Sequence, residues 1–343
     1  MQLSNNLYNQ ELLSFKDTHQ ELSRMINEGI LLQQHIKTVT PILLEIGKEN
    51  HSLTTQKYLE FKEVQDISLE GIVKNIFNAV IQFFKNIIKG VYNFIKSAFG
   101  FQKKVSSANE NLLKQLRPVI SKYSSKLDEI SASKNIPAAN DFADVVKKLQ
   151  IVMDQLTKVS VVQLENKVNR ILENKDEEIS EETNLKLDYS KIFQTDDYTA
   201  YLFKVGIEFD DERPRFKSVF TEEREEDASI KSIGYSFDVL DKLNALVSTK
   251  LEPCKVILEK NCKILEKINA ELTDFSTTDS TAKGELSAPY RKIIEELPKE
   301  ISKFIGLYQV SIQASIVYAT KINEIIKTIY NNIATYSNPE NKL

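Results

Sequence analysis

The sequence has few of the residues that interrupt, cross-link or activate a chain. Its 343 residues include 9 glycines, 8 prolines, 2 cysteines, 3 histidines and no tryptophan. The scarcity of helix-breaking residues, with long periodic runs of Leu, Ile, Lys and Glu, predicts a mainly α fold. A chain of this length can also bury a sizeable core.

The two cysteines give no disulfide. Cys254 and Cys262 lie eight residues apart in one expected helix, about 12 Å at the rise of an α-helix, which is too far for a bridge. Unpaired thiols predict assembly in a reducing cytoplasm. The N-terminal residues also lack the basic segment followed by an apolar one that marks a secretory signal.

Residue types that perform chemistry are scarce as well. All three histidines, His19, His35 and His51, lie in the first 70 residues, so the commonest general base and metal ligand is missing from the rest. We find no phosphate-binding glycine loop, nucleophile elbow or zinc motif. Residues 210–212 are acidic but lack the spaced ligands of a calcium loop, and we expect a solvated turn there. We therefore predict a non-enzymatic protein with no cofactor and no metal site.

Residues 71–104 form the most distinctive stretch. A helix there places lysines in one stripe and apolar residues on the opposite arc. Between residues 71 and 109 the chain has six lysines and no Asp or Glu, whereas an ordinary surface helix mixes its charges. The lysines are too frequent for a membrane span. The candidate membrane-binding or partner-binding residues of this helix are Lys74, Phe77, Ile81, Phe84, Lys85, Ile88, Lys89, Phe94, Ile95, Lys96 and Phe99.

Two interpretations of this helix stay open. It lies on an anionic membrane surface or in the groove of a partner, or it is a core helix whose apolar arc is covered by the rest of the protein. The lysine stripe could touch nucleic-acid phosphates, yet stacking platforms and arginine-rich patches are missing, so no specific nucleic-acid site is evident.

Charge divides at the start of this helix. Residues 1–70 carry six basic and ten acidic side chains, a net charge of −4. The whole chain has 45 basic and 49 acidic side chains and the same net charge, so residues 71–343 hold 39 of each sign. The first 70 residues therefore differ in composition from the rest of the chain.

The predicted architecture is an elongated helical bundle of coiled-coil-like helices with a small β-hairpin insertion around 198–221. In that hairpin, residues 198–209 form one strand, 210–214 the turn and 215–221 the return. We also expect a break in the first helix near Gly29 or Pro41, and another at Ser106 and Ser107. The predicted units are a helical block over 1–70, the basic amphipathic helix over 71–104, a helical hairpin over 105–183, a small α+β insertion over 184–235 and a C-terminal helical hairpin over 236–343.

The junction before the basic helix suggests a family. Residues 67–73, ISLEGIV, leading into a lysine-studded Phe/Ile helix, resemble the internal virion (inner head) proteins of large tailed bacteriophages. The resemblance covers roughly the first 105 residues. It implies that residues 1–70 are a helical propiece that directs the precursor into the procapsid core, and that the phage prohead protease cuts after the Glu of a Ser-x-Glu or Leu/Ile-x-Glu motif. The matching residues are Ser68, Leu69, Glu70 and, beyond the cut, Gly71.

The tripeptide alone is degenerate, because residues 43–45, 108–110, 127–129 and 180–182 fit one form of it or another. Glu70 is favoured because it coincides with the charge boundary, the end of the histidines and the start of the basic helix. The alternative is an ordinary loop in which Ser68 caps a helix.

The resemblance implies a structural protein made in the host cytoplasm and packaged inside the phage head, cut after Glu70 to expose the basic helix, and a candidate for ejection with the genome. The implied partners are the prohead protease and capsid or inner-core proteins. A membrane surface and a homo-oligomer stay open as further partners. The alternative functions are an α-helical pore-forming toxin and a plain helical scaffold.

Overall fold

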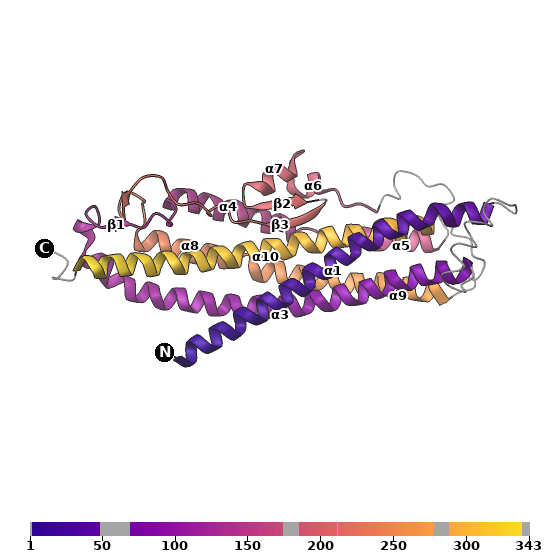
Figure 1. The fold of residues 1–343 in the computed structure, drawn as a ribbon, viewed down its shortest axis with the longest axis horizontal. Coiled ribbons are helices and arrows are strands. Elements are labelled where there is room, and N and C mark those ends of the chain that lie inside the picture. Colours follow the sequence, from indigo (N-terminus) through magenta and orange to yellow (C-terminus); the bar gives the residue numbers. More distant parts are fainter. Residues whose placement is uncertain (1, 49–68, 174–184, 211, 278–287, 338–343) are drawn as a thin grey trace.

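A computed structural model describes residues 2–48, 69–173, 185–210, 212–277 and 288–337. Its long helices are α1 (Gln2–Lys48), α3 (Leu69–Lys122), α9 (Leu251–Thr277) and α10 (Ala288–Ser337). They lie side by side along the long axis of the molecule, α1 running obliquely across α3 and α10 (Figure 1). A shorter helix, α8 (Phe237–Thr249), packs on α3 and α10. The predicted elongated, mainly α bundle is confirmed.

A second, thinner layer covers one side of α10 (Figure 1). It contains α4 (Ala139–Leu156), α6 (Tyr189–Phe193) and α7 (Tyr198–Phe203), the two-residue strands β1 (Ser131–Ala132) and β4 (Ala228–Ser229), and the strands β2 (Ile207–Asp210) and β3 (Arg213–Phe216). The short helix α5 (Val162–Leu172) packs on α9. A 3-10 turn, η1 (Ser124–Lys126), comes after the end of α3.

The predicted break in the first helix is wrong, because α1 continues through both Gly29 and Pro41. A Cβ atom on Gly29 would lie 2.1 Å from Ser302 Oγ and 2.5 Å from the Phe83 ring. Glycine is therefore needed at this position for the close approach of α1 to α3 and α10, and it does not end the helix.

The predicted break at Ser106 and Ser107 is also wrong, because α3 runs through them to Lys122. The Ser106 hydroxyl lies 3.3 Å from Gln102 Nε2, one turn earlier, and 3.1 Å from Ser248 Oγ of α8. These partners satisfy the hydroxyl inside the bundle, so it does not compete for the helix backbone.

The β-hairpin is confirmed but is shorter than predicted. β2 and β3 pair antiparallel from Ile207 opposite Phe216 to Asp210 opposite Arg213. The first half of the predicted strand is the helix α7, because the Asp197 carboxylate accepts the Ala200 amide at 2.9 Å and caps its N-terminus. The aromatic and β-branched content of residues 198–203 thus serves packing of a short helix and not a strand.

A polar layer crosses the apolar core between α3, α8 and α10. The Asn109 side chain, fully buried on α3, donates to Asn244 Oδ1 at 2.9 Å and to the Ala319 carbonyl at 3.1 Å. Its own oxygen accepts from Asn323 Nδ2 at 2.8 Å. All three amides are buried and each has a partner, which is the condition under which polar groups are tolerated in a core.

Candidate processing site and basic helix

The apolar arc of the basic helix belongs to the core. Phe77, Ile81, Phe84, Ile88, Phe94 and Ile95 of α3 are at most 6% exposed. Phe99 is half-buried, and the Lys255 ammonium of α9 lies 5.3 Å from the centre of its ring. In this conformation the arc is covered by the rest of the protein, as one of the two interpretations of the sequence expects.

Helix α1 covers much of this arc. The Phe15 ring stacks on Phe101 at 5.7 Å and tilts against Phe94 at 6.1 Å. Met25 lies over Gly90, where a Cβ atom would be 2.5 Å from the Met25 sulfur. The other neighbours of α3 are α8, α9 and α10. The helix that the sequence places in the propiece is therefore an integral layer of the bundle.

Polar contacts also join α1 to its neighbours. His19 Nε2 lies 2.9 Å from Gln313 Oε1, and Gln309 Nε2 donates to the His19 carbonyl at 2.8 Å and to Ser23 Oγ at 3.0 Å. Thr18 Oγ1 pairs with Ser97 Oγ. Burial lowers the pKa of His19, while its hydrogen bond to Gln313 acts in the opposite direction.

The lysines of the helix lie outside this packing. Lys74, Lys85, Lys89 and Lys96 are all exposed. Within the described ranges none of them has a carboxylate within ion-pair distance. Their positive charge is therefore available to a partner outside the chain.

The predicted cut lies at the start of α3. Ser68 falls outside the described residues, and the helix begins at Leu69, so the Glu70–Gly71 bond lies in its first turn. The first amides of a helix have no carbonyl partners within it. The first turn can therefore unwind at lower cost than any turn in the middle of the helix.

One competing tripeptide lies in the middle of a helix, where a protease cannot bind the backbone without unfolding it, and another lies in a turn. Residues 108–110 lie in the middle of α3, with Asn109 fully buried. In residues 127–129, Glu129 bonds Lys126 Nζ at 2.6 Å and accepts from the Tyr336 hydroxyl. Residues 43–45 belong to the last turns of α1, and residues 180–182 lie outside the described part.

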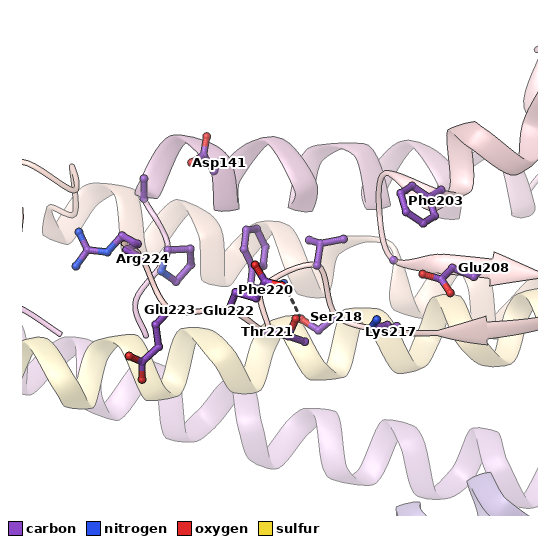
Figure 2. Close-up of a pocket in the computed structure, with 14 residues that line it drawn as sticks. Asp141, Phe203, Glu208, Lys217, Ser218, Phe220, Thr221, Glu222, Glu223 and Arg224 are labelled. Atoms are coloured by element: carbon purple, nitrogen blue, oxygen red, sulfur yellow. Dashed lines mark hydrogen bonds between the residues drawn. The ribbon is translucent and has the colours of Figure 1, made fainter. Parts of the chain in front are cut away.

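A hollow of about 500 Å³ lies between the N-terminus of α4, the end of α7 and the segment after β3 (Figure 2). Ser218 Oγ accepts the Phe220 amide at 3.2 Å. Figure 2 shows the carboxylates of Asp141, Glu208 and Glu223 spread along the hollow and not converging on one point. Its lining contains neither histidine nor cysteine. No group of three or more His, Cys, Asp or Glu in the described residues could hold a metal ion.

One further cluster has no signal in the sequence. The Lys303 ammonium of α10 lies 4.5 Å from the centre of the Tyr189 ring and 5.4 Å from those of Tyr198 and Phe209, and donates to the Tyr198 hydroxyl at 2.9 Å. One turn earlier, Glu300 accepts the Leu187 amide at 2.9 Å, and burial raises the pKa of its carboxyl. These contacts tie the second layer to α10. They join residues about 100 positions apart, which no local pattern reveals.

Comparisons with protein families, curated proteins and solved structures find no match for this chain. Among the described helices, none is long and apolar enough to cross a membrane.

Proposed function

We propose that this chain is a non-enzymatic structural protein packaged inside the head of a tailed phage, and that its precursor is cut after Glu70. The single observation that carries the proposal is the position of α1. It precedes the cut in the sequence, and it covers part of the apolar arc of the helix that begins at the cut. Cleavage would therefore break the covalent connection between α1 and the basic helix that it partly covers.

The packing of α1 determines whether it dissociates from the bundle after the cut. Seven apolar side chains of α1 are buried, namely Phe15, Leu22, Met25, Ile26, Ile30, Ile36 and Val39. Burial of one such side chain contributes about 1.5–3 kcal/mol, so together they favour docking by on the order of 10 kcal/mol or more before entropic costs. A single cut leaves α1 bound, and the part of the arc under α1 is exposed only when α1 is digested or expelled.

The partners implied by this function are the prohead protease and capsid or inner-core proteins. The mature chain would begin at Gly71 with a basic helix and carry no net charge. Once α1 is gone, that helix would offer the part of its apolar arc that α1 had covered to a membrane surface or to a second copy. Ejection with the genome would place it where such a surface is met.

Mass spectrometry of purified virions tests the proposal, and co-expression of the chain with the prohead protease tests its variants. We expect peptides that begin at Gly71, and their loss in the Glu70→Ala variant. Glu110→Ala is the matched control, since Glu110 ends a competing tripeptide and is exposed on the same helix. Peptides spanning Glu70 and Gly71 at full abundance, with none beginning at Gly71, would refute processing.

The toxin alternative has a different signature. If the chain were a pore-forming toxin, the full-length protein would release dye from liposomes without any cut after Glu70. We expect no leakage from the uncut protein, and leakage at nanomolar concentration would favour the toxin over the head protein.

A further inference from the structure

The exposed face of α3 has an unusual composition. From residue 74 to residue 107, its exposed side chains are only lysines, amides and small residues: Lys74, Asn75, Asn78, Ala79, Gln82, Lys85, Lys89, Asn93, Lys96, Lys103 and Ser107. The whole segment contains no acidic residue. The face is thus positive along its length and carries no large exposed apolar side chain.

The lysines lie nearly in line. Successive separations from Lys85 to Lys89, Lys96 and Lys103 are four, seven and seven residues, which keep side chains on one side of a helix. From Lys74 to Lys103 the row extends about 44 Å at 1.5 Å per residue. The opposite side of α3 is packed in the core, so the row is presented on a rigid rod.

The composition of the face decides between two anionic partners. A helix that binds a membrane surface inserts an apolar face beside its lysines, and here the apolar arc is buried under α1, α8, α9 and α10. Nucleic-acid backbones are bound by Lys, Asn and Gln side chains that donate to phosphate oxygens. Tyr92 lies at the border of the face, and its hydroxyl donates a hydrogen bond within the protein, to Glu266 of α9 at 3.3 Å.

We propose that this lysine face of α3 binds the phosphate backbone of double-stranded nucleic acid without sequence preference. The row spans roughly 13 base pairs at 3.4 Å per pair. All five lysines come after Glu70 in the sequence, so the binding belongs to the cut and the uncut chain alike and does not rest on the processing proposed above.

The rest of the chain sets the strength of this binding. The protein as a whole has a net charge of −4 and a pI of about 5.7, which opposes association with a polyanion at a distance. Binding is therefore weak at physiological salt. Each phosphate contacted contributes about −0.9 to the slope of log K against log salt, so five lysines give a slope of about −4 to −4.5.

The test uses full-length protein and a fluorescein-labelled random-sequence duplex of 30 base pairs, with anisotropy measured at several NaCl concentrations from 20 mM. The variant Lys85→Gln/Lys89→Gln/Lys96→Gln is expected to weaken binding more than tenfold at 20 mM NaCl and to reduce the salt slope by about 3. The control variant Lys147→Gln/Lys191→Gln/Lys204→Gln makes the same charge change on exposed lysines of the second layer. It should bind within about twofold of the parent, since its lysines make no phosphate contact.

Three outcomes would overturn the proposal. One is no binding of the duplex at 20 mM NaCl. Another is an equal loss in both triple variants, which would mean a general charge effect. The third is lysine-dependent binding to phosphatidylserine vesicles without binding to the duplex, which would assign the face to membranes. Circular dichroism of each variant confirms that the surface substitutions leave the fold intact.

Discussion

Replacement of Gly29 by alanine tests how α1 is seated on the bundle. In an exposed helix this change would stabilise by about 1 kcal/mol. Here the new methyl group would meet Ser302 Oγ at 2.1 Å and the Phe83 ring at 2.5 Å, and both neighbours are buried. Ordinary carbon contacts need about 3.5–4 Å, so both must shift by more than about 1 Å. Overpacking of this kind costs about 1–3 kcal/mol, and we expect a net destabilisation of about 1–2 kcal/mol.

Urea unfolding followed by circular dichroism measures this change, and limited proteolysis reports whether α1 loosens first. Gly100→Ala is the matched control, because the methyl group there meets only the Glu11 carboxylate, at 2.9 Å, at the end of a flexible side chain. It should leave stability unchanged or raise it by up to about 1 kcal/mol. Ser302→Ala should be neutral alone, since its buried hydroxyl has no hydrogen-bond partner among the described residues, and should rescue part of the loss. A Gly29→Ala protein as stable as the parent would refute the reasoning.

The interior of the bundle supports three further predictions. Asn109→Ala leaves the partner amides unpaired and should cost about 1–3 kcal/mol in urea unfolding, whereas Asn93→Ala on the exposed face of α3 should change stability by less than about 0.5 kcal/mol. Burial lowers the pKa of His19 in the folded state, so the contribution of neutral His19 to the free energy of unfolding is complete above about pH 6.5 and is lost as the pH falls below that value. His19→Gln should make the free energy of unfolding depend less on pH below about 6.5. An unchanged pH dependence would contradict the assignment. Burial raises the thiol pKa of Cys254 and Cys262 to about 12, so Ellman's reagent at pH 8 should find no reactive thiol in the native protein and two after unfolding.

The periodic apolar residues were sufficient to predict the class of fold and the location of the long helices. They were insufficient to place the ends of helices. Gly29 reads as a breaker in the sequence, because its role depends on two side chains from α3 and α10 that are distant in the chain. The helix at residues 198–203 was predicted as a strand, because its aromatic side chains favour strands locally while the Asp197 cap and burial of Leu202 favour a helix in context.

In the candidate site, too, local spacing predicts some features and tertiary contacts determine the others. The lysine stripe and the apolar arc are predictable from spacing alone, and the structure places both on α3 as predicted. Periodicity does not specify which helices of the chain cover the arc, because that depends on the tertiary packing of α1 and its neighbours. The contacts of Lys303 with Tyr189 and Tyr198 had no local signal at all, because an aromatic environment for a lysine is formed by residues from three separate elements.

The layer of Asn109, Asn244 and Asn323 has a consequence for assembly. A slide of α3 along α10 by one turn, about 5.4 Å, would keep most apolar contacts but place three amides in hydrocarbon without partners, at about 1–3 kcal/mol each. Mis-registered bundles are thereby penalised. The three residues lie on α3, α8 and α10, all beyond residue 70. A chain that has lost α1 still contains this layer, which sets the register of α3 against α8 and α10.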